Sequence, residues 1–179
     1  MRIHPQIELS PTERQALKER VQRFMAEFPA PKIIITRGLD GQPRHRLMSV
    51  RTQGFWCYLV TVKPSTKIQE LEADPRIQIV WYKYDADDPG QDQTLRYVSV
   101  SGIAELVRSV EGMRTLPEHN PARIEQERGW RSVTPPTLDE LTDEGLDESR
   151  FGVAIRPVRI RVEGFVPGPR FPIYFRGDE

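Results

Sequence analysis

The stretch Thr61–Tyr82, TVKPSTKIQELEADPRIQIVWY, joins two segments of β-type sequence through one short helix. The first β-type run ends at Thr61, and a turn containing Pro64 precedes a helical pattern that opens at Ser65. Asp74 stands before a proline, which disfavours helical geometry, so the helix ends there. The following run, RIQIVWYKY, has the β-branched and aromatic composition of a strand. The stretch therefore predicts a strand, a short helix and a strand in that order.

Further β-type segments lie on both sides of this stretch. Upstream, KIIITRG, RHRLMSVRT and FWCYLVTV are separated by the turn sequences LDGQP and QG, which predicts a three-stranded meander. Downstream, TLRYVSVSGIAELV and FGVAIRPVRIRVEGF read as two long strands, and Gly102 marks a bulge or bend in the first of them. With about six strands and a few helices, the sequence predicts a mainly β, α+β fold, an antiparallel barrel with peripheral helices.

The 179 residues are enough for one domain with one hydrophobic core. The C-terminal tail, VPGPRFPIYFRGDE, is too apolar for a free end, and we expect it to pack on a partner subunit. We divide the single domain 1–179 into an N-terminal helix (1–30), a barrel core (32–107), a helical segment (108–150), and the last strand with the tail (151–179).

Charge and composition narrow the classes of partner. The 26 Lys and Arg residues equal the 26 Asp and Glu residues, so no broad basic surface is expected to attract nucleic acid or an anionic membrane. No basic and apolar leader pattern or membrane-spanning apolar run is present, which predicts a cytoplasmic protein. Cys57 is the single cysteine and lies in an apolar run, so we expect it to be buried and structural.

The familiar motifs of protein-based catalysis are absent. The sequence has no HExxH, CxxC, GxSxG, Walker or GxGxxG pattern, and its three histidines are scattered. We therefore expect no metal site and name no catalytic residue from the sequence. Difficult chemistry in this chain would have to come from a bound cofactor.

One group of basic and hydroxylic residues does indicate a ligand. Arg46 lies in the second predicted strand, Thr61 ends the third, and the segment Ser65-Thr66-Lys67 opens the short helix. If these two strands are hairpin neighbours, Arg46 and Thr61 face the same side as the helix start. Helix amides, hydroxyls and cations together bind a phosphate monoester. A simpler interpretation is that Ser65 caps the helix and Lys67 is solvated.

The segments PRHRLMSVR, YLVT, PSTK and ADPRIQIVWY, in this order and spacing, resemble the pyridoxamine 5'-phosphate oxidase superfamily of FMN-binding split β-barrels. The resemblance runs from about Lys32 to Val107, with a weaker match in FGVAIRPVRIRVEGF. It implies a split barrel and a homodimer with FMN at the dimer interface. It also implies roles for individual residues: Arg46, Leu47, Met48 and Ser49 along the flavin; Thr61, Ser65, Thr66 and Lys67 at its phosphate; Tyr97 near the flavin; and Arg51 at the substrate.

Two of these residues have a simpler alternative. Met48 in a strand is commonly an ordinary packing residue, and Tyr97 is commonly a plain sheet residue. The chain also departs from the oxidases that act on vitamin B6. The segment RPVRIRVEG has no histidine where those enzymes carry Arg-x-His, and MRTLPEHNPARIEQERGW lacks their Tyr, Arg and Ser.

These features predict an FMN-dependent oxidoreductase that acts on a small anionic or nicotinamide-type donor. Two alternatives remain open at the level of the sequence. One is a flavin-binding or sensing module without turnover. The other is a relative that binds the deazaflavin F420 or haem, for which His45 or His119 would have to supply the axial ligand.

Overall fold

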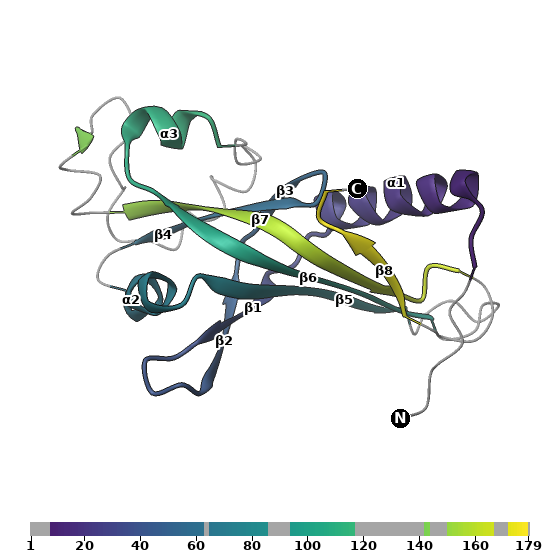
Figure 1. Cartoon of the computed structure of the whole chain (residues 1–179), viewed down its shortest axis with the longest axis horizontal. Coiled ribbons are helices and arrows are strands. Elements are labelled where there is room, and N and C mark those ends of the chain that lie inside the picture. The colour runs from purple at the N-terminus through teal and green to yellow at the C-terminus, as the bar shows by residue number, and fades with distance from the viewer. Residues whose placement is uncertain are drawn as a thin grey trace.

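The computed structural model describes residues 8–62, 65–85, 94–116, 142–143, 150–166 and 172–178. Within these ranges the chain forms one curled, mostly antiparallel sheet with a long helix along it and two short helices at one end (Figure 1). The elements are α1 (Pro11–Glu27), β1 (Lys32–Arg37), β2 (Pro43–Met48), β3 (Arg51–Gln53), β4 (Trp56–Val62), α2 (Thr66–Ala73), β5 (Arg76–Asp85), β6 (Thr94–Val107), α3 (Val110–Arg114), β7 (Arg150–Glu163) and β8 (Ile173–Arg176).

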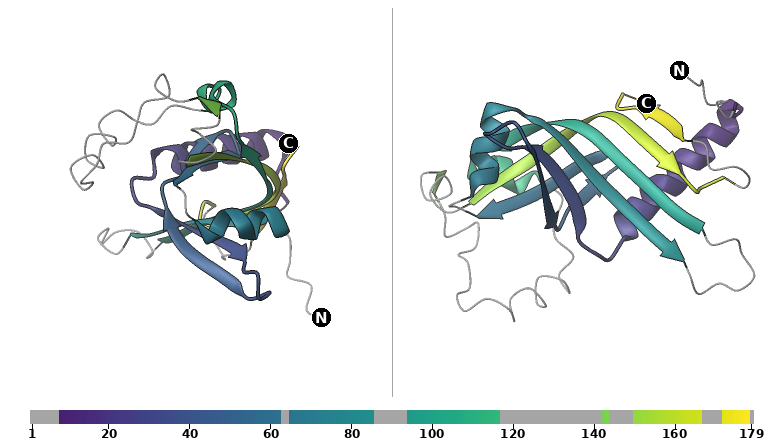
Figure 2. Two further views of the ribbon diagram at one scale, coloured as in Figure 1. Left: turned by 90° about the vertical axis from the view of Figure 1, so that its left-hand side faces the viewer. Right: turned by 90° about the horizontal axis from the view of Figure 1, so that it is seen from below.

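The predicted α+β class with an antiparallel barrel is confirmed. The strands follow the order β2-β1-β5-β6-β7-β4-β3, and β8 pairs with β7. Seen along its length the sheet curls into an open barrel, and α2 lies at the end that faces the viewer (Figure 2, left). The curl brings the β2 and α2 region to one end of a hydrophobic interior.

The described residues contain eight strands, where the sequence predicts about six. One extra strand arises because RHRLMSVRT is divided. Its first part pairs with β1 as far as Met48, and its last part pairs with β4 from Arg51 onward. A single run that serves two different partner strands has to bend between them, and here it does so at Ser49 and Val50.

The predicted three-stranded meander is wrong. β1 pairs with β2, and β3 pairs with β4, but β2 and β4 are not neighbours because β1, β5, β6 and β7 lie between them in the sheet. The turns at Gly41 and Gly54 were correctly located, since both glycines have the positive φ that such turns favour. Turn signals are local, whereas the partner of an edge strand depends on contacts distant in sequence.

The core is built from the inward-facing residues of the strands. The register places Arg46 beside Ile34 and Ile34 beside Ile79, so Arg46 lies on the same face of the sheet as two fully buried residues. Neighbouring residues alternate between faces. Cys57 is also fully buried, and burial raises the pKa of its thiol, as expected for a structural cysteine.

The start of α1 follows the sequence pattern closely. The Ser10 side chain accepts a hydrogen bond from the Glu13 backbone amide, and the Glu13 carboxylate accepts one from the Ser10 backbone amide, which forms a capping box. Leu17, Val21 and Met25 form its buried stripe, and α1 packs on β3. No helix in the described ranges is long and apolar enough to cross a membrane.

The expectation that the tail packs on a partner subunit is not supported for Ile173–Arg176. These residues form β8, which pairs with β7 of the same chain. Phe175 is 2% exposed and its ring lies 5.7 Å from that of Phe55. Ile173 and Phe175, in the described part of the tail, therefore belong to the chain's own core. The expected helical segment 108–150 contains α3, and residues 117–141 and 144–149 lie outside the described residues.

Candidate anion-binding site at the start of α2

The start of α2 differs from both simpler interpretations of its sequence. Ser65 occupies the N-cap position, but its side chain makes no capping hydrogen bond. Lys67 is 5% exposed, although a lysine in the first turn of a surface helix is normally solvated. The hydroxyl of Ser65 is thus not used for capping, and the Lys67 ammonium is directed into the protein.

A partly buried ion pair anchors α2 to the sheet. The Arg46 Nη1 and Nη2 atoms donate to the two carboxylate oxygens of Glu70, at 2.8 and 2.7 Å. The Thr36 hydroxyl donates to Glu70 at 2.7 Å and accepts from Arg46 at 2.8 Å. Burial raises the pKa of Glu70, but the hydrogen bonds from Arg46 and Thr36 outweigh it and hold the pKa below its usual value. Glu70 is therefore a charged carboxylate inside the barrel end.

Lys67 lies beside this ion pair with a poor partner. In the described part of the chain, its hydrogen-bond partner is the thioether of Met48, with Nζ 2.9 Å from Sδ. A thioether is a weak acceptor, so the ammonium has given up water without a matched oxygen. Burial, and then the nearby Arg46 charge, lower the pKa of Lys67 to about 8, while Glu70 acts in the opposite direction.

These residues form what we call the α2 cluster: Arg46, Met48, Thr66, Lys67 and Glu70. Thr66 joins it through its hydroxyl, which lies 3.5 Å from Arg46 Nη2. The cluster holds two cations and one carboxylate at the N-terminal end of a helix. A surplus positive charge, a hydroxyl and helix amides are groups that bind a phosphate monoester.

The other residues assigned to the flavin and phosphate differ in their burial. Thr61, near the end of β4, is 4% exposed, and Ser49 is half-buried after the end of β2. Leu47 is 71% exposed, because alternation turns it to the opposite face from Arg46 and Met48. The structure thus brings Arg46, Met48, Thr66 and Lys67 into contact, and the flavin contacts themselves stay predictions.

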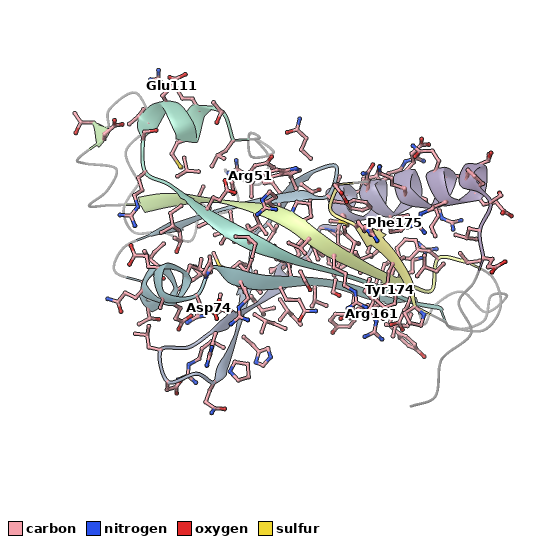
Figure 3. The ribbon with its side chains drawn as sticks, viewed as in Figure 1. Arg51, Asp74, Glu111, Arg161, Tyr174 and Phe175 are labelled. Carbon is pink, nitrogen blue, oxygen red and sulfur yellow. The ribbon has the colours of Figure 1, made fainter. Side chains whose placement is uncertain are left out.

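Tyr97 and Arg51 lie outside the cluster. Tyr97 sits beside Tyr82 in the register, with the Arg161 guanidinium 5.7 Å from its ring centre. Figure 3 shows Arg161 at the end of the sheet away from α2. Arg51 is half-buried on β3, beside α1 (Figure 3). Within one chain, neither residue contributes to the α2 cluster.

Sequence reasoning missed Glu70 and Thr36. The signal for Glu70 is its spacing, because residues three and four apart on a helix share a face. Lys67, Glu70 and the buried Leu71 lie on that common face, so two opposite charges are placed among core contacts. Thr36 carries no such signal, since a threonine is an ordinary strand residue.

Two hollows open at other places. One, of about 610 Å³, lies between the β1–β2 turn and the end of α2, and the other, of about 460 Å³, lies on the outer face of the sheet. Both include Arg37 and Arg76. Asp74 (Figure 3) pairs with Arg76 at 2.6 Å and with Arg37 at 3.7 Å, and the Arg76 hydrogen bond holds the pKa of Asp74 below its usual range. These arginines share one carboxylate and are exposed to water, unlike Lys67.

No protein-family model and no curated protein match the sequence. Solved structures do match its fold. The general stress protein 26 from Bacillus anthracis str. Sterne has a TM-score of 0.57 at 18% identity, over 89% of this chain and 98% of that protein. A protein from Clostridium acetobutylicum related to general stress protein 26, of the pyridoxinephosphate oxidase family, has a TM-score of 0.56 at 14% identity, over 93% and 94%. A FAD-binding protein from Mesorhizobium loti has a TM-score of 0.53 at 17% identity, over 85% and 92%.

Cofactors differ among the proteins that share this fold. A heme binding protein from Mycobacterium smegmatis is also similar in structure, so the fold alone does not select a flavin. The residues of the site therefore have to determine which cofactor is bound. On the fold itself the comparisons agree with the topology described above: the chain has the split-barrel fold of the pyridoxamine 5'-phosphate oxidase-like proteins.

Proposed function

We propose that the protein binds FMN, with the flavin phosphate at the α2 cluster, and acts as a homodimeric oxidoreductase. One observation carries this proposal. Lys67 is a buried ammonium at a helix start, and a thioether is its partner in the described residues. Burying a charge without a matched partner is unfavourable, so such a site is better explained by a ligand that supplies the missing anion.

Each residue of the cluster would have a defined task. Lys67 and Thr66, with the backbone amides of the first turn of α2, would bind the phosphate oxygens. Ser65 offers a hydroxyl that capping does not use. Met48, with Ser49 beside it, would contact the apolar ring system from β2. Leu47 points to the opposite face of the strand and would contact a flavin ring at the proposed dimer interface. We propose that Thr61, near the end of β4, contributes a further hydroxyl.

When bound, FMN supplies the hydride-accepting chemistry that protein side chains lack. The chain would hold the phosphate, orient the ring and keep water from part of it. We further propose a small anionic or nicotinamide-type donor, with Arg51 as the residue that holds its negative charge. No general acid or base is assigned, because hydride transfer to a flavin needs little help from side chains.

Two competing functions make different predictions for the purified protein. A flavin-binding module without turnover would hold a flavin that no nicotinamide reduces. A haem protein would need an axial ligand from His45 or His119. His45 lies exposed on β2, on the face opposite Arg46, and His119 lies outside the described residues. The visible spectrum separates these cases, because flavin bands, a Soret band and a colourless protein are mutually distinct.

The phosphate assignment is tested by substitution at two positions. Lys67→Ala and Thr61→Ala should each weaken FMN binding by roughly 10- to 150-fold, since a charge-assisted hydrogen bond contributes about 1.5 to 3 kcal/mol. Fluorescence titration with FMN measures the change. Lys18→Ala, which removes a lysine from α1, is the control and should leave the affinity unaltered. Unchanged FMN affinity in both variants would show that the phosphate binds elsewhere.

A further inference from the structure

Glu70 is unusual for a residue beside a proposed phosphate site. Its side chain is 4% exposed and it points to the barrel end from α2, among residues that would face an anionic ligand. A carboxylate in this position repels a phosphate, so it needs a role that outweighs the repulsion. Its contacts define two such roles.

The first role is geometric. Both Nη atoms of Arg46 are bonded to the Glu70 carboxylate, and Thr36 holds the same carboxylate from β1. An arginine fork bound at both tips has one fixed orientation. In that orientation Nη2 also lies 3.5 Å from the Thr66 hydroxyl. Glu70 therefore fixes the guanidinium beside the first turn of α2.

The second role is electrostatic. The charged groups that act on Lys67 are Arg46 from β2, which disfavours the ammonium, and Glu70 from its own helix, which favours it. Arg44, also on β2, acts on Glu70 rather than on Lys67. Without the carboxylate, Lys67 would face the Arg46 charge uncompensated in a buried environment.

We propose that Glu70 is a positioning residue for the phosphate of the bound flavin: it orients Arg46 and keeps Lys67 in its charged form. This inference rests on the proposed function, because it deepens the account of the same site. It also assigns the site a pH limit. Phosphate binding weakens once Lys67 loses its proton, and Glu70 raises the pH at which this happens, against the larger effects of burial and the Arg46 charge.

The readout is the ratio of FMN affinity to riboflavin affinity, since riboflavin has the same ring without the phosphate. The pKa of Lys67 is lowered to about 8, so the ratio of the wild-type protein should fall above that pH. The second pKa of a phosphate monoester is about 6, so the ligand charge is constant over this range. In Glu70→Gln the fall should begin at lower pH, which for a half-unit change makes the ratio about twofold smaller at pH 8 and about threefold smaller at pH 9 and above.

Three variants separate the two roles from a loss of folding. Glu72→Gln is the matched control, because Glu72 lies on the same helix but is exposed and pairs with Arg108, and its pH profile should equal that of the wild type. Glu70→Asp keeps the charge but moves it away from Arg46, so it should lower the ratio while shifting the pH of the fall less than Glu70→Gln does. Adding Lys67→Arg to Glu70→Gln should make the ratio independent of pH, because arginine stays charged.

The outcomes are distinct. A folded Glu70→Gln protein, checked by circular dichroism, whose ratio follows the wild type at every pH would overturn the inference. A Glu70→Asp protein with the wild-type ratio and the wild-type pH of the fall would also overturn it. This variant tests the inference even if Glu70→Gln does not fold. If the wild-type protein binds FMN no more tightly than riboflavin, the proposed function fails first and this inference falls with it.

Discussion

At the scale of single residues, the main feature of the protein is a lysine whose charged side chain is buried beside a weak hydrogen-bond acceptor. Lys67 is almost fully buried, its partner in the described residues is a thioether, and it lies next to an arginine that is already paired. The ammonium of an exposed lysine stays hydrated and has no desolvation penalty, whereas burial removes most of the solvent contact of Lys67. The burial of this charge destabilises the protein without ligand, and for the same reason it favours the binding of an anion.

That cost has a measurable pH dependence. The folded-state pKa of Lys67 is about 8 against an ordinary value of 10.5, so between these values the unfolded chain binds more protons than the folded one. Stability without ligand should therefore rise with pH, by about 2 kcal/mol from pH 7.5 to 9.5. Lys67→Met should not show this rise. Urea unfolding of both proteins across this range measures it, and parallel curves would contradict the burial of a charged Lys67.

The sequence anticipated part of the cluster and not the rest. Arg46, Thr66 and Lys67 could be grouped because their spacing resembles a known phosphate site. Glu70 could not, because whether a helical glutamate faces water or the core depends on how the helix is docked. The pairing of Arg46 with Glu70 rather than with a ligand is likewise a tertiary contact without a local signal.

At the scale of elements, local signals and distant contacts contributed differently. The capping box of α1 and the turns at Gly41 and Gly54 were predicted because each depends on a few adjacent residues. The neighbouring strands of β2, and the division of one β-type run into β2 and β3, were not predicted. Strand pairing depends on packing across the whole sheet, and the pattern of a single β-type run does not indicate which strand it will pair with.

Gly102 gives the clearest test at this scale. The register between β6 and β7 shifts at Ser101 and Gly102, and a Cβ at Gly102 would lie 2.5 Å from the Arg156 carbonyl oxygen. Gly102→Ala should destabilise the fold by about 1 to 3 kcal/mol, because the neighbouring backbone has to move. Thermal unfolding measures the loss. Ser101→Ala, next to it on the same strand, is the control, and equal stability of both variants would exclude a tight contact at the bulge.

At the scale of the whole molecule, the curl of the sheet explains why residues distant in sequence meet. β2 and the start of α2 are separated by two strands in the chain, yet Lys67 reaches Met48 and Glu70 reaches Arg46. The same curl leaves Leu47 on the outer face, 71% exposed. A partner subunit and a flavin ring at the interface, as we propose, would cover it.

The proposed dimer is therefore sensitive to a charge at Leu47. Leu47→Glu should weaken dimerisation by at least about tenfold, since a carboxylate would be buried at the interface without a partner. Sedimentation of the wild type and the variant, each with FMN, measures the assembly state. Leu39→Glu changes another exposed leucine, in the β1–β2 turn, and should leave the dimer intact. A wild-type protein that stays monomeric with FMN would contradict the dimeric arrangement.

In the described part of the chain, α2 has cations at both of its ends: the α2 cluster at its start, and the pair Arg37 and Arg76 near its C-terminal end. A crystal structure of the protein grown with FMN decides between them. The account predicts the flavin phosphate at the first turn of α2, with the Lys67 ammonium within hydrogen-bond distance of a phosphate oxygen in place of its contact with Met48. A phosphate bound at Arg37 and Arg76, with Lys67 still against Met48, would contradict it.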